Sequence, residues 1–163
     1  MNLIERRRGM QVSAAKQQGT LVVYPSGYDN VDIKGYVYNV GGMYTGSDST
    51  SCGYLFSDYQ QECWLYLTFD MSALPSNATI LSASCTVKGF SQAQTKQFIM
   101  YSSTVPKGTK DMGTSESVME FDLSNWSASE LKDAKLKVYG NNNAATNYAI
   151  AVYGATLTIN YEY

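Results

Sequence analysis

The sequence contains no histidine, and this absence removes several kinds of chemistry. Without histidine there is no Ser-His-Asp or Cys-His nucleophile system, no imidazole general base and no usual zinc site. Three dispersed cysteines, Cys52, Cys63 and Cys85, make a poor metal set. The sequence also has no glycine-rich phosphate-binding loop. The pair Gly41-Gly42 alone is too weak a signal to predict one. We therefore expect no catalytic, cofactor-binding or metal-binding residue, and no cofactor.

The odd number of cysteines, without tight spacing, argues against a disulfide framework. Cys63 and Cys85 each lie in phase with apolar residues of an alternating stretch, so we expect both to be buried as small hydrophobic side chains. A bridge between Cys52 and Cys63 is an open alternative.

Charged residues are also few, at 16% of the chain, where an average soluble protein has about 25%. Hydrophobic residues make up 44%, and there are 14 tyrosines against 5 phenylalanines and 2 tryptophans. No run approaches the roughly 18 apolar residues of a membrane helix. The beginning of the chain lacks the apolar stretch of a signal peptide. This composition favours a protein that is made and assembled in the cytoplasm and sits in an assembly.

The few charges are unevenly distributed. Residues 1–19 contain four basic residues and one acidic residue, for a net charge of +3, whereas the remainder has a net charge of −5. We interpret residues 1–19 as an anchoring arm that docks on an acidic surface of a neighbouring subunit. A disordered terminus is the alternative, and a nucleic acid is not the expected partner. The residues predicted to bind the partner are Leu3, Ile4, Arg6, Arg7 and Arg8.

The clearest structural pattern runs from Trp64 to Lys88. Apolar and polar residues alternate up to Phe69, which is typical of a strand with one buried face. Met71–Asn77 contains turn-forming residues, and Asp70 is placed to accept hydrogen bonds from the amides of this turn. Alternation then resumes in a second strand. The apolar side of that strand is predicted to consist of Leu81, Ala83, Cys85 and Val87.

Further strands are expected at 21–24, 36–40, 97–101, 118–123, 134–138 and 148–161, with a weak one at 54–56. Turns or loops are predicted at 25–27, 41–42, 105–114 and 140–146. Ser127 and Glu130 form a capping-box pattern that predicts a short helix over 128–133, and Trp126 before it is expected in the core. A change of phase at Tyr153-Gly154 predicts a β-bulge or a corner.

Together these patterns predict an all-β protein, a β-sandwich or jelly-roll-like fold of eight to nine antiparallel strands with one short helix and an N-terminal arm. Residues 20–163 form the predicted sandwich domain.

Carboxylates are the remaining candidates for catalysis, since two of them can hydrolyse a glycoside. The candidate pairs are Asp29 with Asp32, Asp58 with Glu62, and Glu120 with Asp122. Nothing in their spacing demands a catalytic pair, and we interpret them as solvated strand charges. An alternative is that Asp29 and Asp32 bind a calcium ion, but the sequence around them lacks the dense acidic loop of an EF-hand.

Tyrosines cluster beside a polar loop rich in serine, threonine and glycine. Exposed tyrosines with polar neighbours can stack on sugars or contact proteins. Tyrosines shared between core and surface are the simpler interpretation. The candidate surface or glycan contacts are Tyr36, Tyr38, Tyr44, Tyr54 and Tyr59.

The stretch F-D-x-S, L-P-x-N-A-T-I and S-A-x-C-x-V, beginning at Phe69 and ending at Val87, resembles a β-sandwich module of tailed-bacteriophage virion proteins. Trp126, Ser129-Glu130-Leu131 and Tyr153–Tyr161 match the end of the same pattern. The resemblance covers roughly residues 61–163 and transfers no functional residue.

The resemblance implies a non-enzymatic virion structural protein, a head decoration or head-fibre subunit docked through its arm. Its expected partners are other virion proteins of the capsid or tail and further copies of itself, and its expected location is the virion. The alternative is a tail or baseplate adhesin whose carbohydrate-binding sandwich contacts a host surface glycan.

Overall fold

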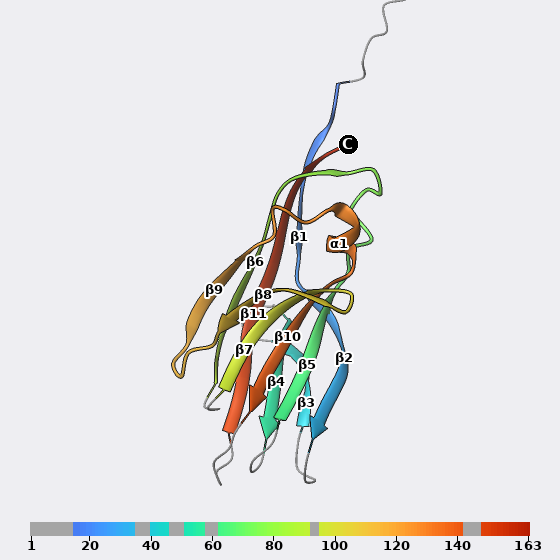
Figure 1. The fold of residues 1–163 in the computed structure, drawn as a ribbon. Helices are drawn as coiled ribbons and strands as arrows, with labels where there is room; N and C mark the ends of the chain where they lie inside the picture. The colour runs from blue at the N-terminus through green and yellow to red at the C-terminus, as the bar shows by residue number, and fades with distance from the viewer. Residues whose placement is uncertain (1–14, 35–39, 46–50, 58–61, 92–94, 142–147) are drawn as a thin grey trace, which may run out of the picture.

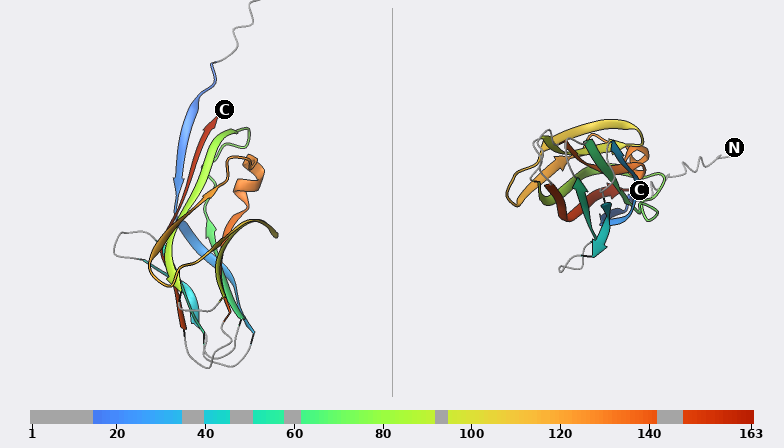
Figure 2. Two further views of the ribbon diagram at one scale, coloured as in Figure 1. Left: turned by 60° about the vertical axis from the view of Figure 1, so that its left-hand side comes forward. Right: turned by 90° about the horizontal axis from the view of Figure 1, so that it is seen from below.

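The computed structural model describes residues 15–34, 40–45, 51–57, 62–91, 95–141 and 148–163, and the side chains of 15–27, 66–90, 97–140 and 154–163. The chain forms two antiparallel β-sheets that face each other as a sandwich (Figure 1, Figure 2). The predicted all-β sandwich is therefore confirmed.

The six-stranded sheet is built around one long strand, β11 (Tyr148–Glu162). One edge of β11 pairs with β6 (Thr79–Ser91), and β6 in turn pairs with β9 (Ser117–Asp122). The other edge of β11 pairs with two strands in succession. Residues 157–162 pair with β1 (Gln18–Val23), and residues 148–151 pair with β4 (Ser51–Ser57). Strand β3 (Val40–Thr45) pairs with the far edge of β4.

The five-stranded sheet has β10 (Ala134–Asn141) at its centre, with β5 (Glu62–Phe69) on one side and β7 (Thr95–Ser102) on the other. Strand β2 (Pro25–Lys34) pairs with the outer edge of β5. Strand β8 (Val105–Asp111) pairs with the outer edge of β7.

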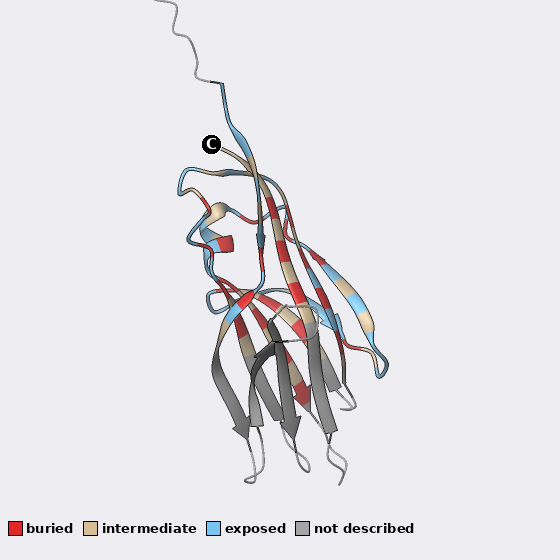
Figure 3. Cartoon of the chain, turned by 180° about the vertical axis from the view of Figure 1, so that it is seen from behind, coloured by how far each residue is buried: buried red, intermediate tan, exposed pale blue. Residues whose placement is uncertain are grey.

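The hydrophobic core lies between the two sheets, and buried residues alternate with more exposed ones along the central strands (Figure 3). Cys85 is fully buried there, as its phase predicts. Residues facing the core include Leu67 and Phe69 of β5, Phe98 and Met100 of β7, Leu136 and Val138 of β10, Ala83, Cys85 and Val87 of β6, and Ala155, Leu157 and Ile159 of β11.

The helix α1 (Ala128–Lys132) begins at a complete capping box. The N–H of Glu130 donates to the Ser127 hydroxyl at 3.2 Å, and the N–H of Ser127 donates to the Glu130 carboxylate at 2.9 Å. Leu131 and Trp126 are buried in the core, so the predictions of a capped helix and of a core tryptophan are confirmed. No helix in the described part of the chain has the length and apolar character of a membrane span.

The turn after β5 is held as expected by Asp70. Its carboxylate accepts a hydrogen bond from the N–H of Ser72 at 3.0 Å. The hydrogen bonds from the Ser72 backbone and hydroxyl hold the pKa of Asp70 below its usual value.

The sheets contain eleven strands in the described residues, more than the eight to nine expected. The predicted loop at 105–114 is wrong, because most of it forms β8, an edge strand whose exposed side chains leave no apolar alternation to read. The turns predicted at 25–27 and 41–42 are also wrong. Pro25 begins β2 at a sheet edge, where its missing N–H is tolerated. Gly41 and Gly42 lie within β3, paired with Leu55 and Tyr54.

Two irregularities interrupt the pairing of β6 with β11. The first lies between Val152 and Gly154, which confirms the predicted β-bulge. The second lies between Asn160 and Tyr161 and shifts the phase of β6 beside it. Leu81, expected on the buried face, is 48% exposed as a result.

The residues just before β1 (Gln18–Val23) join the two ends of the described chain. Gln17 and Tyr163 exchange two backbone hydrogen bonds, at 2.9 and 3.0 Å, and Lys16 forms an ion pair with Glu162. Strand β1 begins at Gln18, so the last residues assigned to the arm belong to the sheet. The proposed anchors Leu3, Ile4 and Arg6–Arg8 lie outside the described residues.

Replacement of Val138 by alanine should destabilise the protein by about 2 kcal/mol, because its side chain is fully buried at the centre of β10. Val118→Ala is the matched control, since the Val118 side chain is 63% exposed and should cost less than about 1 kcal/mol. Urea denaturation of both variants measures the difference. Equal losses would contradict the core position of Val138.

Stability should also fall in acid through Glu130. Hydrogen bonds from Lys107 first, and then from the Ser127 backbone and hydroxyl, lower the pKa of its carboxyl from 4.5 to about 2. A lowered pKa means that the folded state binds fewer protons, so this stabilisation is complete above about pH 4.5 and disappears as pH falls toward about 2.

Denaturation of Glu130→Gln over the same pH range should therefore show a shallower loss than the original protein. Lys107→Met should remove only part of the dependence of stability on pH, because the hydrogen bonds from Ser127 to the Glu130 carboxylate remain. An unchanged slope in Glu130→Gln would show that the carboxyl makes no such contribution.

Candidate functional site

The outer face of the six-stranded sheet carries a concentration of small polar side chains. On β6, Ser82 and Ser84 alternate with buried Ala83 and Cys85. Thr158 and Asn160 of β11 alternate in the same way with buried Leu157 and Ile159. Since alternate residues of a strand point to opposite faces, the strands that bury the core also expose this row of polar groups.

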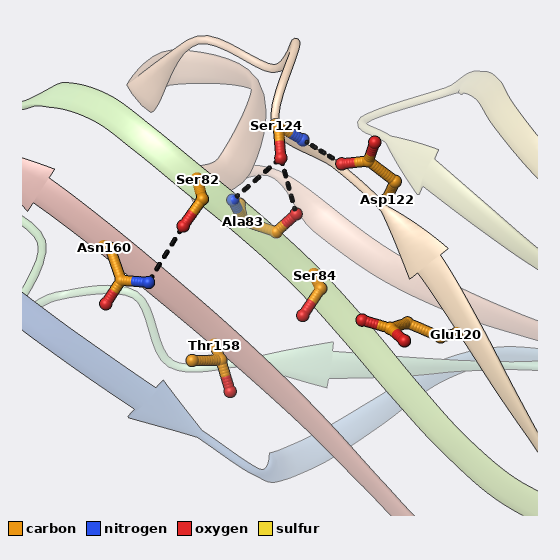
Figure 4. Close-up of a pocket in the computed structure, with 8 residues that line it drawn as sticks. All are labelled: Ser82, Ala83, Ser84, Glu120, Asp122, Ser124, Thr158 and Asn160. Carbon is orange, nitrogen blue, oxygen red and sulfur yellow. Dashed lines mark hydrogen bonds between the residues drawn. The ribbon is translucent and has the colours of Figure 1, made fainter.

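These side chains line a depression of about 270 Å³, which we call the polar groove (Figure 4). Strands β6 and β11 form its floor, and β9 with the residues after it forms one side. It is lined by Ser82, Ala83, Ser84, Glu120, Asp122, Ser124, Thr158 and Asn160.

Hydrogen bonds between neighbouring strands hold several of these groups in place. The Asn160 amide donates to the Ser82 hydroxyl at 2.8 Å. At the other side, the Ser124 hydroxyl lies 3.4 Å from the N–H and 3.5 Å from the carbonyl oxygen of Ala83. The groove is thus a pre-arranged set of donors and acceptors contributed by β6, β9 and β11 (Figure 4).

The negative charge of the groove comes from Glu120 and Asp122, two residues apart on β9. The Ser124 N–H donates to the Asp122 carboxylate at 2.9 Å. Hydrogen bonds from the Ser124 hydroxyl and backbone lower the pKa of Asp122. A general acid needs a raised pKa to hold its proton near neutral pH, so Asp122 is suited to accept hydrogen bonds from a ligand rather than to donate a proton.

The described side chains offer neither a reactive thiol nor a metal-binding group. Burial raises the pKa of the Cys85 thiol to about 12, which leaves it without thiolate character at neutral pH. Within the described ranges, no three His, Cys, Asp or Glu side chains are grouped so that they could hold a metal ion.

The structure describes the backbone of only two of the five tyrosines that the sequence suggested as surface or glycan contacts. Tyr36, Tyr38 and Tyr59 lie outside the described residues. Tyr44 lies in β3, opposite Cys52, and Tyr54 lies in β4, opposite Gly42, so the two belong to neighbouring strands. Their side chains are outside the described set, as are those of Cys63, Asp29, Asp32, Asp58 and Glu62.

A different group of tyrosines comes together on the five-stranded sheet. The rings of Tyr66 and Tyr101 meet edge to face, with centroids 5.5 Å apart. The Lys137 ammonium group lies 5.8 Å from the ring centroid of Tyr66 and 5.2 Å from that of Tyr139. These two rings already contact a cation within the chain, which makes them a weaker candidate for sugar stacking than an open ring face.

From the sequence, Glu120 and Asp122 were considered only as a candidate carboxylate pair and interpreted as solvated strand charges. The alternation around Ala83 and Cys85 leaves Ser82 and Ser84 on the polar side of their strand. Neither Thr158 nor Asn160 was singled out from the sequence. The signal for them is the alternation of polar residues with Leu157 and Ile159 in the strand predicted at 148–161. The sequence alone could not show that these residues lie beside β6.

No protein-family model matches this chain, and no curated protein matches it. Solved structures similar to it include a family 36 carbohydrate-binding module in complex with calcium and xylotriose, with 14% identity and a TM-score of 0.36, covering 78% of this chain and 92% of that one. A family 11 carbohydrate-binding module from Clostridium thermocellum, in complex with a β-1,3-1,4-mixed-linked tetrasaccharide, is similar at 11% identity and a TM-score of 0.40, covering 86% and 87%. The likeness is distant, and the ligands belong to those modules.

Proposed function

We propose that this protein is a non-enzymatic binding module whose polar groove holds a carbohydrate. The observation that carries the proposal is the composition of the groove, in which hydroxyl, amide and carboxylate groups from three adjacent strands share one surface. A sugar presents hydroxyls that both donate and accept hydrogen bonds around a ring. Serine and threonine hydroxyls and the asparagine amide also do both, and a carboxylate is a strong acceptor.

The polarity of the groove also supports a hydrated ligand. Sites for drug-like molecules are mostly apolar and bury most of the ligand. Here the sides include Asp122 and Ser124, which are exposed. Neighbouring strands are about 4.8 Å apart, so groups on β6, β9 and β11 can reach different hydroxyls of one ligand. Strand-mounted groups are also ordered before binding, which reduces the entropy lost on association.

The place of the groove in the fold is compatible with attachment elsewhere. Strand β1 and the end of β11 leave the sandwich at the same end (Figure 1), where Gln17 pairs with Tyr163. A partner that held residues before Lys16 would grip the protein at this end. The polar groove on β6, β9 and β11 would remain open to a glycan.

Thr158→Val should weaken glycan binding about three- to tenfold, because it removes one hydroxyl of the groove while keeping the shape of the side chain. The measurement is depletion of the full chain by a panel of neutral polysaccharides and bacterial cell walls, followed by calorimetry. Thr109→Val on β8, exposed on the opposite sheet, is the matched control and should bind as the original protein does. Absence of binding throughout the panel would contradict the proposal, as would equal affinities of the two variants.

A second candidate concerns the assembly that carries the module. The residues that resemble tailed-phage virion proteins lead us to propose a virion subunit, a head decoration or head-fibre protein or a tail adhesin, oligomeric and docked through its basic N-terminal residues. The supporting observation is the position of β1, which leads from the arm into the sheet at the same end as Tyr163.

Deletion of residues 1–14 should abolish incorporation of this protein into phage particles and leave its thermal unfolding midpoint unchanged, since Lys16 and Gln17 keep their contacts with Glu162 and Tyr163. Incorporation is measured by quantitative mass spectrometry of purified particles. A variant with Arg6, Arg7 and Arg8 replaced by glutamine separates charge from chain length. Normal incorporation of the deleted protein would place the attachment on the sandwich instead.

A further inference from the structure

A second depression, the terminal groove, adjoins the polar groove on the six-stranded sheet. It has a volume of about 300 Å³ and lies toward the end where β1 enters the fold. Asn160 lines both depressions, so they meet at this residue. The terminal groove is lined by Gln18, Gly19, Thr20, Leu81, Asn160 and Tyr161.

A hydrogen-bonded row of side chains joins the two grooves across three strands. The Thr20 hydroxyl donates to the Asn160 side-chain oxygen at 2.7 Å, and the Asn160 amide donates to the Ser82 hydroxyl at 2.8 Å. The register explains the row, because Thr20 lies opposite Asn160 on one edge of β11 and Ser82 lies opposite it on the other. The row therefore links the two grooves through Asn160 and holds its donors and acceptors in place.

The irregularity beside Asn160 adds an apolar element to this surface. It leaves Leu81 48% exposed and lining the terminal groove. A sugar ring has a face of C–H groups as well as hydroxyls, and an exposed leucine side chain can cover that face. The terminal groove thus differs in character from the polar groove, where carboxylates and hydroxyls predominate.

Charge restricts the kind of ligand that this path can accept. Glu120 and Asp122 lie at the β9 end, and the hydrogen bonds from Ser124 lower the pKa of Asp122, which favours its charged form. Lys88 of β6 forms an ion pair with Glu116, and Lys16, which precedes β1, forms one with Glu162. Carboxylate or sulfate groups of a ligand would meet like charge in the polar groove.

We propose that the two grooves bind one extended, non-anionic oligosaccharide that crosses the strands from β1 to β9. This inference rests on the proposed function and specifies its ligand. The path crosses three strand spacings, about 14 Å in all, so a single sugar ring fills only part of it.

Calorimetric titration with cello-, xylo- and chito-oligosaccharides of one to six units tests the proposal, with oligogalacturonates as the anionic counterpart. For the series that binds, affinity should rise at least tenfold from one unit to about three units and then level off. Oligogalacturonates should bind at least tenfold more weakly than the neutral series. Asp122→Asn should reduce this difference in affinity, because it removes one negative charge from the polar groove. Asparagine keeps an oxygen that can accept from the Ser124 N–H.

Substitutions in the two grooves locate the ligand along the path. Thr20→Val should reduce the gain in affinity with chain length at least threefold, because it removes one hydroxyl of the terminal groove and its hydrogen bond to Asn160. Thr158→Val should weaken binding at every length, and Thr109→Val should change neither quantity. Thermal unfolding of each variant controls for folding.

The possible failures are distinguishable. Binding of a glycan without any dependence on chain length would overturn the extended path and leave the proposed function standing. So would a Thr20→Val variant that keeps the full gain with length. Absence of binding by every oligosaccharide and every polymer would overturn the proposed function, and this inference with it.

Discussion

The antiparallel pairing of β6 with β11 determines how the rest of the molecule is arranged. The two strands run together from the pair Thr79 and Glu162 to the pair Ser91 and Ile150. One face of this ladder supplies the fully buried Cys85 to the core. Its edges receive β9 on one side and β1 and β4 on the other, so the six-stranded sheet is assembled around it. The ladder pairs the facing backbone groups of the two strands, and β9, β1 and β4 pair with groups on their outer edges. One face of the sheet can then be buried against the core while the other is open to water.

The two irregularities in this ladder also define the proposed site. Between them, β11 alternates strictly, which turns Thr158 and Asn160 outward together. Beyond the second irregularity the phase of β6 changes, and Leu81 reaches the surface next to Asn160. A bulge thus converts a position with a core-like residue into part of an outer surface, which is a common way of redirecting a side chain.

Much of the fold was predictable because its signals are local. The capping box at Ser127, the turn after Asp70 and the change of phase at Gly154 each involve residues a few positions apart. The missed strand β8 has exposed side chains at an edge and contains Pro106, so neither alternation nor propensity reveals it. Leu81 was assigned to the wrong face, because the irregularity beside it depends on the partner strand.

The sequence by itself determined that the chain is built of half-buried strands, that a capped helix follows Trp126, and that histidine chemistry is excluded. Tertiary structure alone decided which polar faces lie side by side. Ser82 and Asn160 are 78 positions apart, and Thr20 and Asn160 are 140 positions apart, yet each pair is joined by a hydrogen bond. Periodicity states which face of a strand is buried, but the choice of its neighbour depends on how all the strands together bury their apolar faces.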